Sequence, residues 1–159
     1  MKNYLLLLGV TLFINQVQGQ TLQWQGNTFE VNDVKASVVS LQGEEVLKVE
    51  RDLKALPFDV ESLYTTVDEP TYVKLKDVTI ENGVVEVKVL SRIQASSPFE
   101  AAQGFIGIAF RIDEENSAYE SIYLRPKVGR SENQLARNHT VQYYAYPDYK
   151  FDKLRQEVY

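Results

Sequence analysis

Arginine, tyrosine and the chain's only histidine are concentrated in residues 119–143. From 121 to 139 there are four basic residues and one acid, Glu132, a local charge of +3 in a chain whose net charge is −5. Tyrosine offers an aromatic face and a hydroxyl, and arginine offers a planar set of donors. Together these groups suit the CH faces and hydroxyls of sugars, or the carboxylates of acidic sugars. The stretch is therefore a candidate saccharide-binding site.

The acidic residues give little sign of catalysis. A retaining glycanase needs two carboxylates about 5 Å apart, and the chain has no E-x-D-x-E pattern. The motifs H-E-x-x-H and G-x-S-x-G and a glycine-rich phosphate loop are also absent. The densest acidic group falls in a predicted loop, which we interpret as a solvated turn, or at most one that tolerates calcium. Its members are Asp113, Glu114, Glu115 and Glu120.

His139 leaves a catalytic alternative open. A lone histidine is more often a hydrogen-bonded structural residue than a catalyst. In the alternative, the protein is a glycoside hydrolase or lyase in which His139 or Tyr123 is the base and Arg125 or Arg137 neutralises charge. We predict no cofactor and no metal centre, and a chain without cysteine has no disulfide or thiolate site.

Strands are predicted along most of the chain. The runs 34–41 and 45–51 flank a Gln-Gly-Glu-Glu turn and predict a hairpin. The runs 71–80 and 84–93 predict a second one, since Asn82-Gly83 between alternating runs is a strong hairpin signal. In that hairpin Val85, Val87 and Val89 are expected to face the core, with Glu86 and Lys88 in water. Further strands are predicted over 105–112, 121–126 and 141–147, and one short helix over 58–64.

Strand alternation divides 105–112 and 121–126 into an apolar and a polar face. We expect the polar face to admit a flat ligand, because small residues lie there beside aromatic and guanidinium groups. In the alternative interpretation this face is simply solvated. The apolar faces contain Ile106, Ile108, Phe110, Ile112, Ile122 and Leu124, and the polar faces contain Gly107, Ala109, Arg111, Tyr119, Ser121, Tyr123 and Arg125.

Residues 1–19 have the composition of an export signal. Lys2 is followed by an apolar stretch over 5–14, too short for a helix to span a bilayer, and then by the small residues Val17 and Gly19. We predict cleavage before Gln20 and a periplasmic or extracellular location. A retained anchor or a buried hydrophobic helix is the alternative, although no further apolar segment predicts a membrane span.

The mature chain, residues 20–159, is predicted to be one domain. Removing residues 1–19 takes away one basic residue and no acid, so 16 basic and 22 acidic residues remain, a net charge of −6. Binding to nucleic acid is not expected at that charge. The number and spacing of the strands favour an all-β, antiparallel two-sheet sandwich or jelly roll.

The segment 104–155 resembles the concanavalin A-like lectin/glucanase family of secreted bacterial proteins, related to laminin-G-like and 3-keto-disaccharide hydrolase domains. The matching runs are GIAFRI, YESIYLRP, RNHTVQY and YPDY. The resemblance extends more weakly back to residue 28 and implies a two-sheet jelly roll whose concave face meets carbohydrate. It implies that this face carries Arg111, Tyr123, Arg125, Arg137, His139, Gln142 and Tyr143.

The family pattern continues beyond the position of Tyr159 with several more strands. The resemblance therefore predicts either a fragment of a longer protein, which we favour, or a shortened sandwich with exposed edges that would pair or aggregate. In either case the concave site would be incomplete. The function that we predict is saccharide binding without a catalytic acid pair, and the hydrolase or lyase is the alternative.

Overall fold

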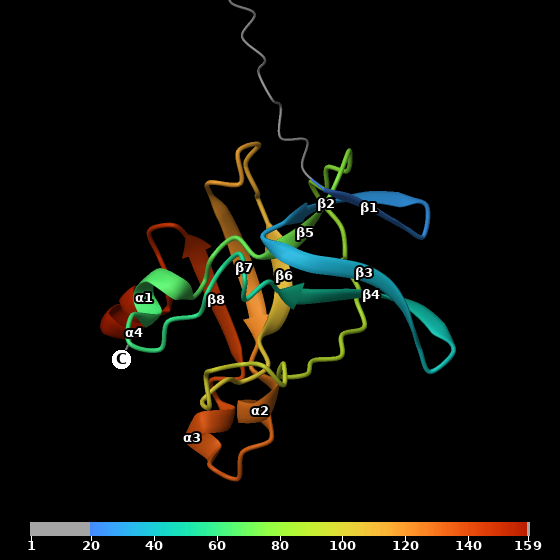
Figure 1. Cartoon of the computed structure of the whole chain (residues 1–159). Helices are drawn as coiled ribbons and strands as arrows, with labels where there is room; N and C mark the ends of the chain where they lie inside the picture. The colour runs from blue at the N-terminus through green and yellow to red at the C-terminus, as the bar shows by residue number, and fades with distance from the viewer. Residues whose placement is uncertain (1–19, 159) are drawn as a thin grey trace, which may run out of the picture.

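The computed structural model describes residues 20–158. The predicted export signal, residues 1–19, lies outside this part, as does Tyr159. None of the helices between residues 20 and 158 has the length and apolar composition that crossing a bilayer requires. The described chain is mostly β-structure arranged in three antiparallel sheets, which confirms the all-β class (Figure 1).

Two of the three sheets come from the first half of the chain. Strands β1 (Thr21–Trp24), β2 (Asn27–Asn32) and β5 (Tyr72–Leu75) pair in the order β1-β2-β5. The β1-β2 hairpin was not predicted; its Gln25-Gly26 turn has positive φ at both residues, the conformation of a tight hairpin turn. Strands β3 (Val34–Leu41) and β4 (Glu44–Arg51) form the predicted first hairpin.

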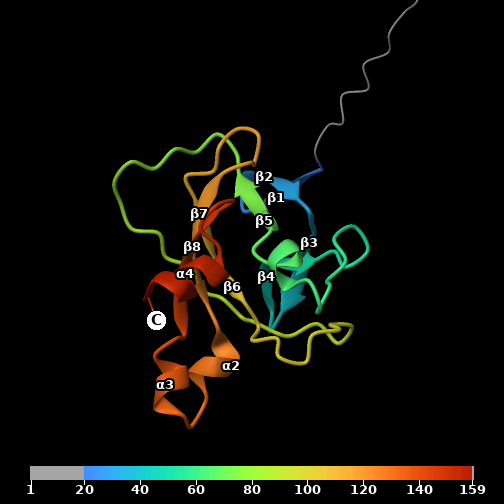
Figure 2. The same cartoon turned by 90° about the vertical axis from the view of Figure 1, so that its left-hand side faces the viewer.

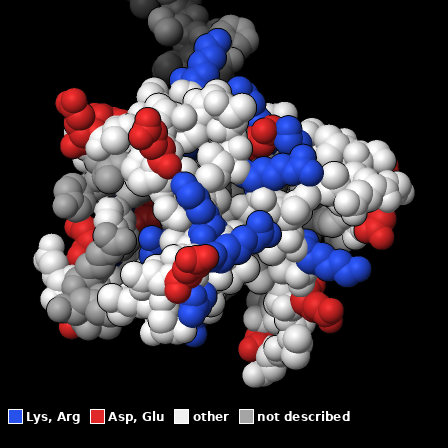
Figure 3. All heavy atoms as spheres, turned by 90° about the horizontal axis from the view of Figure 1, so that it is seen from below, with Lys and Arg blue, Asp and Glu red and all other residues white. Residues whose placement is uncertain are grey.

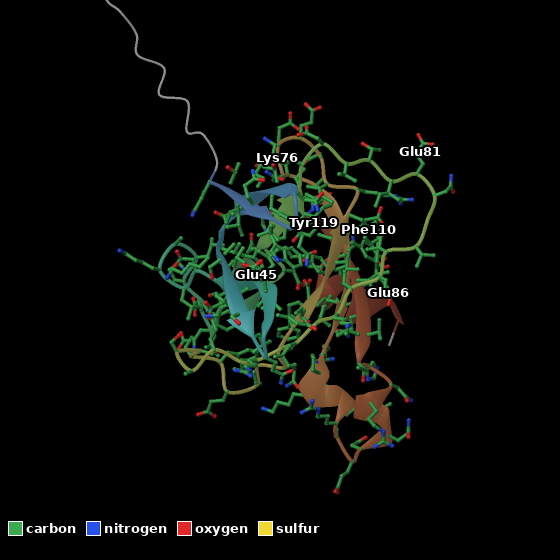
Figure 4. The ribbon with its side chains drawn as sticks, turned by 90° about the vertical axis from the view of Figure 1, so that its right-hand side faces the viewer. Glu45, Lys76, Glu81, Glu86, Phe110 and Tyr119 are labelled. Atoms are coloured by element: carbon green, nitrogen blue, oxygen red, sulfur yellow. The ribbon has the colours of Figure 1, made fainter. Side chains whose placement is uncertain are left out.

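The third sheet contains the segment that resembles the lectin family. Strands β6 (Ile106–Phe110), β7 (Tyr119–Leu124) and β8 (Val141–Tyr146) pair in that order. The three predicted strands are thus confirmed, each shorter or shifted by one or two residues. This sheet forms one layer. The other two sheets lie together on one side of it and form the second layer (Figures 2 and 4).

The contact between the two layers is built from aromatic rings and a few polar bridges. Tyr119 of β7 lies between the layers (Figure 4), and its ring packs edge-on against Tyr72 of β5 with centroids 5.1 Å apart. Lys74 Nζ donates to the Asp113 carbonyl oxygen at 2.6 Å, and Asn116 Nδ2 donates to Glu30 Oε1 at 3.3 Å. The loop between β6 and β7 therefore fastens the third sheet to the first.

The second predicted hairpin is wrong in its second half. Strand β5 ends at Leu75, and residues 84–93 belong to no helix or strand of the described structure. Val85, Val87 and Val89 are exposed instead of facing a core. The alternating pattern gives this run the polarity of a strand, but a strand also needs a hydrogen-bonded neighbour, and within residues 20–158 no strand pairs with it.

Four short helices lie at the ends of the third sheet and in the β4–β5 connection. The predicted helix over 58–64 is displaced, since α1 covers Leu63–Thr66. Helices α2 (Pro126–Gly129) and α3 (Gln134–Arg137) occur in the basic stretch, residues 125–139, where no helix was predicted, and α4 (Phe151–Val158) follows β8. Pro126 begins α2, and the Asn133 side chain caps α3 by accepting from the Ala136 amide at 3.2 Å.

Candidate functional site

The sheet β6-β7-β8 has an inner face toward the other sheets and an outer face away from them. The inner face carries the polar set of the sequence prediction: Tyr119, Ser121 and Tyr123 are 3%, 6% and 8% exposed. Ile122 on the outer face is 49% exposed. The expected alternation is therefore present, but the prediction that the tyrosine face is open to ligand is wrong. It is the buried face, because Tyr119, Tyr123 and Tyr144 form the buried core cluster there, and Tyr72 of β5 packs against them.

The buried tyrosines satisfy their hydroxyls within the protein. Tyr119 Oη and Tyr144 Oη are 2.9 Å apart, and Tyr119 Oη also donates to the Asp68 carbonyl oxygen at 3.2 Å. Burial raises the pKa of Tyr144 to about 12, and it also raises the pKa of Tyr119. These hydroxyls are held protonated and hydrogen-bonded, which suits a structural core better than a catalytic base.

Gly107 has a packing role at this face. A β-carbon at this position would lie 2.3 Å from the Ile122 carbonyl oxygen and 2.6 Å from Tyr123 Cβ. The absent side chain lets β6 pass close to Tyr123, whose ring meets Phe105 edge-on at 5.7 Å. The small residues that we expected to admit a ligand therefore accommodate the protein's own tyrosine.

The outer face carries an exposed polar trio formed by Arg111, Glu120 and Tyr143. Arg111 Nη1 donates to Glu120 Oε1 at 2.7 Å, and Tyr143 Oη donates to Glu120 Oε2 at 2.9 Å. Both hydrogen bonds favour the charged carboxylate, so Arg111 first and then Tyr143 lower the pKa of Glu120. One carboxylate therefore orients a guanidinium and a phenol side by side on a solvent-facing sheet.

Apolar side chains surround this trio. Ile122 is the cross-strand neighbour of Tyr143 and of Ile108, and all three are more than one-third exposed. Arg111 follows the last residue of β6 and has a φ of +53°, so its side chain does not follow the alternation of that strand and lies on the outer face. The parity argument had placed it with Gly107 and Ala109. Glu120 was the residue missing from the predicted site, although its alternation with Ile122 on β7 could have identified it.

In the basic stretch, several polar groups form hydrogen bonds to other residues of the same stretch. Arg137 donates to the carbonyl oxygens of Ser131 and Glu132 at 2.7 and 2.8 Å, and to Gln134 Oε1 at 2.5 Å. The Arg125 amide donates to the Thr140 carbonyl oxygen at 2.8 Å, and the His139 amide donates to that of Ala136 at 3.0 Å. Both side chains are half-buried. Lys and Arg side chains gather on the surface viewed from this end of the molecule (Figure 3).

The predicted site residues thus fall into three groups instead of one cluster. Arg111 and Tyr143 meet on the outer face through Glu120. Tyr123 and Gln142 meet on the inner face, where Tyr123 Oη donates to Gln142 Oε1 at 2.8 Å. The third group belongs to the helical stretch after β7 and consists of Arg125, Arg137 and His139.

Comparisons with known proteins assign neither a family nor an activity. No protein-family model, curated protein or solved structure matches the chain. Across residues 20–158, His, Asp and Glu side chains do not gather in threes in a way that could hold a metal ion. The outer-face trio offers a ligand accessible polar groups that are oriented by hydrogen bonds to one another.

Proposed function

We propose that this chain is an exported, non-catalytic saccharide-binding protein that binds its ligand on the outer face of β6-β7-β8. The main support is the Arg111–Glu120–Tyr143 trio. In it the exposed ring of Tyr143 lies beside a donor, the Arg111 guanidinium, and an acceptor, the Glu120 carboxylate, and hydrogen bonds to Glu120 hold the three groups together. We further propose that the two packed layers belong to the concanavalin A-like jelly-roll class, and that export uses residues 1–19.

The chemistry of the trio fits a sugar ring. The Tyr143 side chain and the neighbouring Ile122 present apolar surface to the CH face of a pyranose. Glu120 is held charged and accepts from sugar hydroxyls, while the mostly exposed Arg111 guanidinium has donors left for hydroxyl or carboxylate oxygens. Because each group is already oriented by another, binding costs little side-chain ordering.

Surface charge narrows the ligand class. The chain has a net charge of −5, which disfavours strongly anionic polymers such as nucleic acid. At the trio itself, however, one guanidinium lies beside one carboxylate and the two formal charges balance. A neutral or weakly acidic saccharide suits such a surface better than a polyanion.

A glycan array followed by an activity assay tests this proposal. We expect mature protein to retain a subset of neutral or weakly acidic glycans, and Tyr143→Ala to lose them. Lys127→Ala is the matched control, because this exposed lysine lies on α2. Release of reducing sugar from a bound polysaccharide would instead support the hydrolase or lyase alternative. Binding that Tyr143→Ala leaves unchanged would contradict the assignment of the outer face.

A further inference from the structure

Residues 84–90, Val-Val-Glu-Val-Lys-Val-Leu, form an exposed run whose backbone is not paired with any strand of the described chain. Every residue from 75 to 90 is exposed, including Val84 at 94%. No backbone hydrogen bond joins residues 77–93 to another segment of the described chain. The run stands apart from β6-β7-β8 on the outer side of that sheet, where Glu86 is labelled in Figure 4 and which Figure 2 shows from the opposite direction.

Such a run is a template for β-pairing. Its exposed amide and carbonyl groups can pair with a second strand, and such pairing would cover valine side chains that now face water. Val85, Val87 and Val89 alternate with Val84, Glu86, Lys88 and Leu90, so an added strand would gain a fully apolar side and a mixed side. The charges on the mixed side determine which strand fits.

The run is complementary to itself in antiparallel pairing. If the two-fold axis passes through Val87, Glu86 lies opposite Lys88 of the second copy, and Lys88 lies opposite its Glu86. Val85 then lies opposite Val89, and Val84 lies opposite Leu90, so apolar residues meet apolar residues throughout. Directly opposed opposite charges and β-branched pairs are the contacts that stabilise antiparallel strands.

The same charges reject the neighbouring registers. Moving the axis one residue back places Glu86 against Glu86 of the second copy, and moving it one residue forward places Lys88 against Lys88. Like charges directly opposite each other are destabilising. A self-complementary strand with one favoured register is what an isologous two-fold interface requires. Within the described residues neither Glu86 nor Lys88 forms an ion pair that would compete.

From this pattern we propose that residues 84–90 pair with the same residues of a second copy to form a two-fold symmetric dimer. The proposal does not depend on saccharide binding. It predicts that mature protein sediments as a concentration-dependent dimer, and that residues 84–90 are protected from hydrogen exchange in that dimer.

Charge reversal provides the test. Glu86→Lys alone and Lys88→Glu alone should each raise the dimer dissociation constant, by about ten- to a hundredfold, because each places like charges together twice. The double variant Glu86→Lys/Lys88→Glu should restore wild-type dimerisation, and an equimolar mixture of the single variants should form a heterodimer. Glu81→Lys, outside the pairing, is the matched control, and circular dichroism checks the fold of every variant. A monomer at all concentrations, or a dimer indifferent to both single changes, would overturn the proposal.

Discussion

The hydroxyl oxygens of Tyr119 and Tyr144 lie 2.9 Å apart, between rings that meet nearly at right angles with centroids separated by 5.6 Å. The two residues come from adjacent strands, β7 and β8, and both are among the few side chains buried in the described structure. The interior of this protein is therefore held by tyrosines, whose polar ends are satisfied by one another and by a backbone carbonyl.

Tyr119→Phe should destabilise the fold. The change leaves the ring in place but removes the hydroxyl that bonds to Tyr144 and to the Asp68 carbonyl oxygen, so buried polar atoms lose a partner. We expect the free energy of unfolding to fall by about 1–3 kcal/mol in urea titrations. Tyr143→Phe on β8, which removes the hydroxyl of an exposed tyrosine, serves as the matched control. An unchanged urea midpoint for Tyr119→Phe would contradict the role assigned to the pair.

Stability should be lost in alkaline solution as the tyrosine core ionises. The pKa of Tyr144 is raised to about 12 by burial, whereas an unfolded tyrosine has a pKa of about 10. A raised folded-state pKa means that the stabilisation is complete below pH 10 and is lost as pH rises from 10 through 12. Absorbance titration of tyrosinate should show a late group that ionises together with unfolding by circular dichroism. Ionisation of every tyrosine near pH 10 in a folded protein would be incompatible with this core.

Gly107→Ala should disturb the β6-β7 contact. The new methyl group would lie 2.3 Å from the Ile122 carbonyl oxygen, so the strands must separate or Tyr123 must move. We expect a loss of about 1–3 kcal/mol in unfolding free energy. Ile108→Ala, on the exposed side of the same strand, should cost less. Thermal melts in which the two variants behave alike would argue against the close approach.

The sequence predicted the strands of the third sheet well and their burial poorly. Alternation in 105–112 and 121–126 follows from local geometry, and it correctly grouped the residues of each face with the exception of Arg111. Which face is buried depends on the second layer, since Tyr119 is covered by Tyr72, 47 positions earlier in the chain. Similarly, Asn82-Gly83 marks a change of direction, but the pairing of 84–93 depends on a neighbour that local signals cannot supply.

The candidate site was predicted only in part. Arg111 and Tyr143 were correctly selected by residue type, yet the side chain that joins them, Glu120, was assigned to a solvated turn. A positive φ is often indicated by glycine in the sequence, but here the residue is Arg111, so the direction of the Arg111 side chain could not be predicted. Arg137 was selected for its charge, but the carbonyl oxygens that occupy it become available only once α3 forms.

Arg137→Ala should loosen the α2–α3 segment without affecting saccharide binding. The guanidinium donates to two backbone carbonyls and to Gln134, so its loss should speed amide hydrogen exchange in residues 131–138. Lys127→Ala is the control with an exposed side chain nearby. Weaker saccharide binding by Arg137→Ala, with unchanged exchange, would move the binding site from the outer face to the basic stretch.

Titration calorimetry of the outer-face variants with a saccharide retained on the array tests the central claim most directly. Tyr143→Ala should weaken binding by roughly tenfold or more, because the aromatic platform is lost. Tyr143→Phe should retain most of the affinity, and Glu120→Gln should weaken binding by removing the charge that orients Arg111 and Tyr143. All three should unfold at temperatures close to that of the parent protein. Full affinity in both Tyr143→Ala and Glu120→Gln would contradict the account.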